Sequence, residues 1–252
     1  MINPNPAELF NLIKNAKYLV ALTGAGVSTL SGIRDFRGKN GLYNEMDAEK
    51  IFDIEYFEKD PSLYYSSAGS FIYNINEKEP SIVHTVLGDL EKRGYLKSVI
   101  TQNIDLLHQK GGNTKVIEIH GSPKVHYCFR CAGIRMSFEE AAAIVRAGGM
   151  PQCPNCGRVL KPAITFFGEN LPAEALRESV TEAQNTDLML ILGTSLTVNP
   201  AATIPNYTLR SGGQIVIVNN MSTHLDRQAV MHFDELGPLF EELHKIILEE
   251  HT

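Results

Sequence analysis

The four cysteines of this chain form two Cys-x-x-Cys pairs, a spacing typical of a metal site. The pairs are Cys128 with Cys131 and Cys153 with Cys156, and 21 residues lie between them. Each pair folds back so that its two thiolates point the same way, and two such pairs supply the tetrahedral sulfur ligands that zinc prefers. A site closed by four protein ligands has no position for a substrate. We therefore expect one structural Zn²⁺ and look for the chemistry elsewhere.

Two disulfides or a redox centre are the alternative uses of these cysteines. Disulfides suit small secreted domains, whereas a chain of 252 residues is long enough to bury its own core. The first six residues are polar and proline-rich and lack the apolar core of an export signal. A redox Cys-x-x-Cys motif needs only one pair, so the zinc interpretation is favoured.

A glycine-rich segment at residues 24–29, Gly-Ala-Gly-Val-Ser-Thr, could bind phosphate. Glycines there let backbone N–H groups approach a pyrophosphate, helped by the N-terminus of a following helix. The segment departs from the dinucleotide fingerprint because Thr29 stands where a third Gly or Ala is usual. A hydride-transferring dehydrogenase is therefore disfavoured, and a plain strand-to-helix turn stays open as the alternative.

Apolar runs and segments of helical period alternate along the chain, which predicts an α/β fold with a parallel sheet. Strands are expected at residues 18–22, 98–101, 188–192 and 215–218, and helices at 6–16, 81–93, 173–183 and 236–249. Small or polar residues follow each of these strands. Because the carboxyl ends of parallel strands share one edge of a sheet, the loops after them should converge on one ligand crevice.

Composition excludes some classes of function. The chain is 43% apolar and 21% charged with a net charge of −6, and its basic residues form no run, so we expect no direct nucleic-acid partner. No segment approaches the ~20 apolar residues of a membrane span, so we expect no membrane association. We expect a monomer in the cytoplasm, a reducing compartment.

Several motifs occur in one order along the chain. They are Gly-Ile-Arg-Asp-Phe-Arg-Gly at 32–38, Thr-Gln-Asn-Ile-Asp at 101–105, His-Gly at 120–121, the four cysteines, Pro-Ala-Ile-Thr-Phe-Phe-Gly-Glu at 162–169, Gly-Thr-Ser-Leu at 193–196 and Val-Asn at 218–219. This order resembles the sirtuin family over roughly residues 19–219. Sirtuins are NAD-dependent protein-lysine deacylases that combine a Rossmann-like domain with a small zinc-bearing lobe, and the substrate peptide lies in the cleft between them.

The resemblance implies a Rossmann-like parallel sheet with helices on both faces, plus a small zinc-binding and helical lobe formed by insertions. The NAD-binding domain would comprise residues 1–40, 81–120 and 162–252, and the small domain residues 41–80 and 121–161. NAD is the implied cosubstrate and an acetylated protein or peptide lysine the implied partner. The residues that the resemblance places against NAD are Gly24, Ala25, Gly26, Thr29, Asp35, Phe36, Arg37, Gln102, Ile104, Asp105, Gly193, Thr194, Ser195, Asn219 and Asn220. A further contact to adenine is expected near Phe233 or Asp234.

The resemblance also implies a catalytic group made of His120, Asn103 and Asp105. The acetyl oxygen of the substrate attacks the nicotinamide ribose C1′ and expels nicotinamide, and His120 then acts as general base toward the ribose hydroxyls. The products are the free lysine, nicotinamide and O-acetyl-ADP-ribose. A neutral imidazole with a pKa near ~6.5 suits this role. Asn103 as a simple turn residue and Asp105 as a helix cap are the structural alternatives, and His108 is interpreted as structural.

Substrate contacts are implied for the segment after residue 164. The resemblance assigns them to Thr165, Phe167, Gly168, Glu169, Asn170 and Val198. We expect main-chain pairing with the peptide there, which makes little demand on its sequence. Phe166 and Phe167 are assigned equally well to the core or to the pocket.

This sequence departs from the family pattern at three places. Arg34 replaces a proline in the cofactor loop, and Thr165 replaces a valine in the substrate wall. Residues 42–45, Leu-Tyr-Asn-Glu, lack the arginine of members that favour succinyl or malonyl groups, so acetyl is the expected acyl group. A deacylase that prefers a longer acyl chain, a mono-ADP-ribosyltransferase and a non-catalytic zinc-bearing binding module are the competing hypotheses.

Overall fold

The structure, a computed structural model, describes residues 5–35, 41, 48–68 and 72–250. Six parallel strands form the main sheet in the order β3-β2-β1-β7-β8-β9. Their bounds are β1 Leu19–Thr23, β2 Leu96–Thr101, β3 Val116–Glu118, β7 Leu188–Leu192, β8 Gln214–Val218 and β9 Met231–Phe233. The chain progresses outward from β1 in one direction and from β7 in the other, so the two strands flank the switch point of the sheet, where α/β proteins bind ligands.

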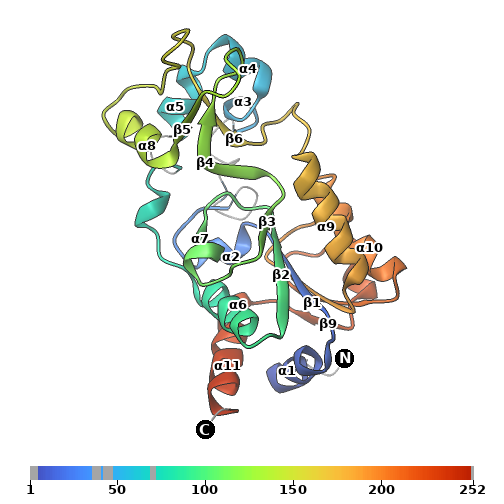
Figure 1. Cartoon of the computed structure of the whole chain (residues 1–252). Coiled ribbons are helices and arrows are strands. Elements are labelled where there is room, and N and C mark those ends of the chain that lie inside the picture. The colour runs from blue at the N-terminus through green and yellow to red at the C-terminus, as the bar shows by residue number, and fades with distance from the viewer. Residues whose placement is uncertain (1–4, 36–40, 42–47, 69–71, 251–252) are drawn as a thin grey trace.

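Helices cover both faces of this sheet, which explains why its strands are continuous apolar runs (Figure 1). One face carries α1 (Pro6–Asn15), α6 (Ile82–Lys92) and α11 (Leu236–Glu249), and the other carries α9 (Ala173–Asn185) and α10 (Ile204–Arg210). Successive side chains of β1 point to opposite faces of the sheet. Leu19 and Ala21 pack in the first cluster, whereas Val20 and Leu22 pack in the second.

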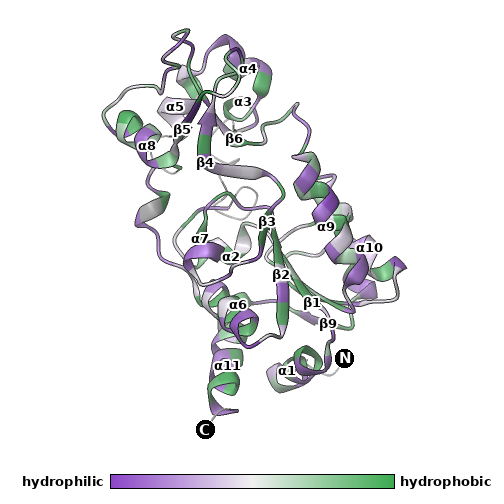
Figure 2. Cartoon of the chain, viewed as in Figure 1, coloured by the Kyte–Doolittle hydropathy of each residue, from purple (hydrophilic) through white to green (hydrophobic). Residues whose placement is uncertain are grey.

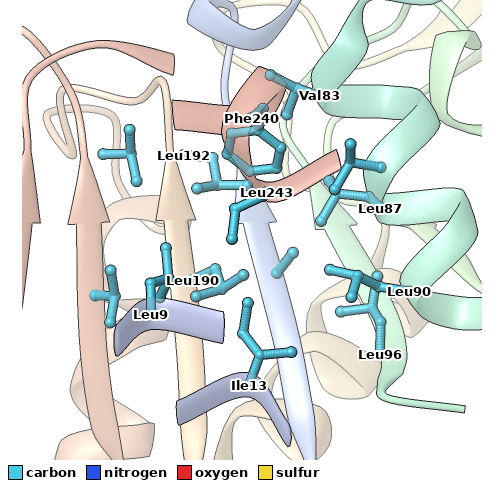
Figure 3. Close-up of a cluster of buried hydrophobic side chains, with 14 of the residues drawn as sticks. Leu9, Ile13, Val83, Leu87, Leu90, Leu96, Leu190, Leu192, Phe240 and Leu243 are labelled. Atoms are coloured by element: carbon cyan, nitrogen blue, oxygen red, sulfur yellow. The ribbon is translucent and has the colours of Figure 1, made fainter. Parts of the chain in front are cut away.

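Leucine and isoleucine side chains fill the space between α1, α6, α11 and the sheet (Figure 3). Leu9, Ile13 and Leu243 are each 1% exposed or less, and burial of one such side chain contributes roughly 1.5–3 kcal/mol. Polar residues occupy the outer sides of these helices (Figure 2). Asn5 caps α1 by accepting from the Ala7 N–H, with Pro6 in the first turn.

A second, antiparallel sheet has the order β5-β4-β6 and lies with short helices at the opposite end of the molecule from the termini (Figure 1). Its strands are β4 Gly121–Tyr127, β5 Arg135–Ser137 and β6 Lys161–Ile164. The helices of this unit are α3 Ala48–Ile51, α4 Ile54–Lys59, α5 Ser62–Ala68, the 3₁₀ turn η2 Ile75–Glu77 and α8 Phe138–Arg146. An aromatic cluster joins them: Tyr73 stacks on Phe138 with centroids 5.8 Å apart, and the Tyr73 hydroxyl lies 2.7 Å from His126 Nε2.

The parallel sheet with helices on both faces and the cysteine-bearing unit agree with the expected fold class. All four strands predicted from the sequence are present, with no end shifted by more than two residues, and the strand at 188–192 and the helix at 236–249 have the expected bounds. Helices α8 and α10 were not predicted. The expected domain boundary at residue 162 falls inside β6, whose register with β4 places it in the small sheet. No helix of the described ranges is long and apolar enough to cross a membrane.

Candidate active site

A cleft of about 1050 Å³ opens between the carboxyl edge of the main sheet and the small antiparallel sheet. The loops after β1, β2, β7 and β8 all contribute to its wall, as the strand order requires. Every described residue that the sequence assigned to NAD, catalysis or substrate lines this one cleft. They are Gly24, Ala25, Gly26, Thr29, Asp35, Gln102, Asn103, Ile104, Asp105, His120, Thr165, Phe167, Gly168, Glu169, Asn170, Gly193, Thr194, Ser195, Val198, Asn219 and Asn220. Phe36 and Arg37 lie outside the described residues.

The glycine-rich turn packs directly on the loop after β7. Gly24 N–H donates to Leu192 O at 3.0 Å, and Gly26 N–H donates to Gly193 O at 2.9 Å. A Cβ at Gly26 would lie 2.7 Å from Gly193 Cα, so neither loop leaves room for a side chain. The helix that follows, α2 (Gly26–Thr29), is one turn long. Its dipole is therefore small. The N–H groups of Gly24 and Gly26 are bonded within the protein, so these glycines serve to bring the turn close against the loop after β7.

Asn103 and Asp105 are held by a hydrogen-bond network that includes Ser28. Asn103 Nδ2 donates to Gly24 O at 3.0 Å and to Ser28 Oγ at 3.1 Å. Ser28 Oγ donates to Asp105 Oδ2 at 2.6 Å, and Asp105 Oδ1 accepts from the Leu107 N–H at 3.0 Å. The first residue of α7 (Leu107–Lys110) is thus bonded by Asp105, although the cap position itself is Leu106. Asn103 is more than a turn residue, because it joins two strand ends.

Gln102 connects the loops on either side of the switch point. Its Nε2 donates to Thr194 Oγ1 at 2.9 Å, and its backbone N–H donates to Thr23 O at 3.0 Å. The same residue presents its carbonyl oxygen to His120, 2.8 Å from Nδ1.

The carbonyl of Gln102 fixes the tautomer of His120. A carbonyl oxygen can only accept, so Nδ1 carries the proton and Nε2 keeps a free lone pair. Burial lowers the pKa of His120 from its ordinary value, and the bond to Gln102 opposes that shift. A neutral imidazole with a free nitrogen in the cleft is the arrangement of a general base.

Behind this wall lie two buried histidines that do not reach the cleft. His108 Nε2 lies 2.8 Å from Thr23 Oγ1, which donates to Thr101 Oγ1 at 2.9 Å, and Thr101 Oγ1 in turn accepts from the Asn103 N–H. His84 packs against His108 with ring centroids 4.6 Å apart. His108 is 1% exposed, in keeping with the structural role that the sequence suggested.

The segment after β6 forms the opposite wall. Thr165 N–H donates to His120 O at 2.7 Å, which places this segment beside the histidine. The two phenylalanines differ: Phe166 is 2% exposed and belongs to the aromatic core, whereas Phe167 is 41% exposed. The backbone of Phe167 is hydrogen-bonded on both sides: its N–H donates to Phe52 O at 2.7 Å, and its carbonyl accepts from the Ile54 N–H at 3.1 Å.

Some lining residues were not selected from the sequence. Ser28 lies within the glycine-rich segment, and its hydroxyl beside two glycines was the signal that could have identified it. Leu171, just before α9, and Leu176, in its first turns, carry no such signal. Asp234 lines the cleft at the end expected for adenine, while Phe233 does not, and Arg34 lines it too.

The four cysteines lie together in the small unit. Their sulfur atoms are all within 4.8 Å of one another, and Cys128 Sγ lies 3.6 Å from Cys156 Sγ. A tetrahedral Zn–S site with bonds of about 2.3 Å needs sulfur separations of about 3.8 Å. All four cysteines are free thiols, and Cys128 and Cys153 are buried against Leu160. They are therefore positioned to bind one zinc ion.

Fold and site together define an α/β protein whose parallel sheet is of the nucleotide-binding type, with a cleft lined by His120 and an appended unit that carries four clustered cysteines. The profile of the Sir2 family matches residues 24–200. An NAD-dependent protein deacetylase of Thermotoga maritima is 42% identical over 227 residues, which cover 90% of this chain and 92% of the relative. This chain belongs to the Sir2 family.

Solved structures agree with that assignment. Sir2 with a deacetylated p53 peptide and 3′-O-acetyl ADP ribose superposes with a TM-score of 0.90 at 39% identity, covering 98% of both chains. A complex of Sir2 with a p53 peptide and NAD⁺ has a TM-score of 0.87 at 38% identity, covering 98% of this chain and 99% of that one.

Proposed function

We propose that this protein is an NAD-dependent protein-lysine deacetylase. The observation that carries the proposal is His120, which lines the cleft and whose Nδ1 is bonded to Gln102 O, so that Nε2 keeps its lone pair. Relatives named NAD-dependent protein deacetylase, at 42% identity, support it. A non-catalytic module is disfavoured, since it has no need of a buried base with a fixed tautomer.

NAD supplies a ribose carbon that loses nicotinamide, and the acetyl oxygen of the substrate lysine takes its place. We assign the pyrophosphate to the wall that Gly24, Gly26 and Gly193 form, where the two loops pack together without side chains between them. The adenosine half is assigned to Thr194, Ser195 and Asn219 on the loops after β7 and β8. We assign Asp35, Phe36 and Arg37 to the cofactor loop on the basis of their sequence motif.

Asn103, Asp105 and His120 act at the nicotinamide ribose. Both donors of the Asn103 amide are used by Gly24 and Ser28, so its oxygen remains to accept from a ribose hydroxyl or an ordered water. His120 Nε2 removes a proton from the ribose hydroxyls, which allows the 2′-oxygen to attack the acyl carbon. The bond between the acyl carbon and the lysine nitrogen then breaks, the amine leaves with a proton, and a water molecule supplies the second oxygen of the acetyl ester that remains on ADP-ribose.

The peptide is assigned to the segment from Thr165 to Asn170 and to Val198. Because Phe167 already pairs its backbone with Phe52 and Ile54, main-chain contacts to the peptide fall to the neighbours of Phe167. We propose that residues 41–80 with 121–164 form the small domain, that its zinc ion is structural, and that the enzyme is a cytoplasmic monomer. The four free thiols suit a reducing compartment.

Mass spectrometry of an acetyl-lysine peptide, with and without NAD, tests the proposal. The expected result is loss of the acetyl group only with NAD, and faster turnover of acetyl than of succinyl peptide. Attachment of ADP-ribose to protein with the acetyl group retained would instead establish a mono-ADP-ribosyltransferase. A faster reaction on longer acyl chains would correct the acyl preference alone.

A further inference from the structure

Lys161, the first residue of β6, is a buried cation inside the small unit. It is 1% exposed, and its ammonium makes three short contacts: to Ile164 O at 2.6 Å, to Glu169 Oε2 at 2.8 Å and to Pro162 O at 3.2 Å. An ammonium has three N–H donors, so every donor has an acceptor. The ring of Phe166 lies over the same group, 4.0 Å from Nζ to the centroid.

Glu169, eight residues further along the chain, supplies the carboxylate that pairs with Lys161. The oxygen that pairs with Lys161, Oε2, also accepts from the Phe166 N–H at 2.7 Å, and the Glu169 N–H donates to Phe166 O at 3.1 Å. Residues 161–169 therefore form a loop whose two ends are joined by an ion pair. Thr165, within it, donates to His120 O at 2.7 Å.

Such a pair is costly to break, because a charge left without its partner in a buried place keeps its desolvation penalty. Burial lowers the pKa of Lys161 from its ordinary value, and the Glu169 carboxylate opposes that shift. The short contacts of the pair described above lie within residues 161–169, whereas we assign NAD to the glycine-rich turn and the loop after β7.

We infer that Lys161 and Glu169 are positioning residues that hold the segment 165–169 in the shape that receives the substrate peptide. This inference rests on the proposed function and deepens it. The Glu169 side chain thus acts through an internal bond, and the direct substrate contact predicted from the sequence for this residue falls to its backbone. The consequence is a separation of effects: loss of the pair weakens peptide binding and leaves NAD binding unchanged.

The test measures steady-state kinetics of Lys161→Met and Glu169→Gln, varying acetyl-peptide and NAD separately. We expect the peptide KM to rise about tenfold or more in either variant. The NAD KM should stay within about twofold of the original value, since a uniform loss of peptide binding leaves the other substrate unaffected. The double variant should be little worse than either single one, because both remove the same interaction.

A matched control comes from Glu182 on α9, which pairs with Lys115 at 2.5 Å and accepts from Ser98 Oγ at 2.6 Å away from the cleft. Glu182→Gln should lower the free energy of unfolding while leaving both KM values unchanged. Anisotropy of a labelled acetyl-lysine peptide gives the same comparison without turnover, and urea unfolding shows which variants fold.

The inference would be overturned if folded Glu169→Gln binds the peptide with unchanged affinity, or if both KM values rise equally. Either result counts against the inference alone, provided that the original enzyme deacetylates. If Lys161→Met does not fold, Glu169→Gln decides the question. Absence of NAD-dependent deacetylation by the original protein would refute the proposed function itself, and the inference with it.

Discussion

His120 Nδ1 lies 2.8 Å from the carbonyl oxygen of Gln102, a residue that also bonds Thr194 across the switch point of the sheet. The orientation of the base is therefore set by the residue that connects the two halves of the NAD crevice. This link is made by a backbone carbonyl, so it depends on the position of β2 and not on the identity of the Gln102 side chain.

His120→Ala should reduce kcat by about 10²–10⁴-fold, because a positioned general base contributes that much to a proton transfer. Stability should change little by comparison. The measurement is nicotinamide release with a saturating acetyl-peptide, and His224→Ala, at an exposed position of the same chain, is the control. Near-original kcat in His120→Ala would remove it from the mechanism.

The pH dependence of kcat/KM follows from the state of this imidazole. Burial lowers the pKa of His120, and only the unprotonated ring can accept a proton. Activity should therefore be complete at pH 7 and fall as the pH drops through an apparent pKa below ~6.5. A fall in kcat/KM on the acid side that is governed by an apparent pKa above 7 would contradict the burial of His120.

Acid should destabilise the fold through three buried histidines. Burial lowers the pKa of His84 to about 4, of His108 to about 3 and of His126 to about 4. Below pH 6.5 these histidines bind protons in the unfolded chain but stay neutral in the folded chain. Their contribution to the free energy of unfolding is therefore complete above that pH and is lost as the pH falls toward 4. Each histidine contributes about 1.4 kcal/mol per pH unit in this window.

Urea unfolding at pH 7, 5.5 and 4.5 checks this, with zinc content measured in the same samples. His108→Gln should reduce the slope of the free energy of unfolding against pH by the contribution of about one bound proton. Constant stability between pH 7 and 5 would show that the histidines are not buried in neutral form.

Gly121, the residue after His120, should tolerate no side chain. Its φ is +76°, and a Cβ would lie 2.2 Å from Ala163 O on the paired strand β6. Gly121→Ala should cost about 2 kcal/mol or more and displace the histidine. Gly212→Ala is the matched control, because Gly212 has φ +84° with no heavy atom within 4 Å of the added carbon. Equal costs for the two variants, measured by thermal unfolding, would refute the clash.

Zinc removal should unfold the small unit and abolish deacetylation. The cysteines and Leu160 form their own hydrophobic cluster, so loss of the ion removes the centre of that region. Cys153→Ser should lower the zinc content from one ion per chain, and chelation of the original protein should do so reversibly. Full activity of a zinc-free protein would contradict a structural role.

Much of the fold could be predicted from the sequence because its strands are buried on both faces. The runs at β1, β7 and β8 are continuous and end in small or polar residues, which places the crevice. Helix α8 was missed because it lies between the two cysteine pairs and was included with the zinc knuckles. Strand β6 was not predicted either, since a four-residue strand gives little pattern.

The site's internal bonds could not be predicted in this way. Ser28 and Asp105 are 77 residues apart in sequence and meet only because β1 and β2 are neighbours. Lys161 is charged and would be expected on the surface, but the acceptors of its own loop make its burial possible.

The fate of the acetyl group distinguishes transfer to ADP-ribose from simple hydrolysis and from ADP-ribosylation of protein. A peptide carrying ¹³C-acetyl-lysine is incubated with the protein and NAD, and labelled products are quantified by mass spectrometry. Deacetylated peptide, nicotinamide and labelled acetyl-ADP-ribose should form in equal amounts. Release of the label as free acetate without nicotinamide, or NAD consumption with the label still on lysine, would contradict it.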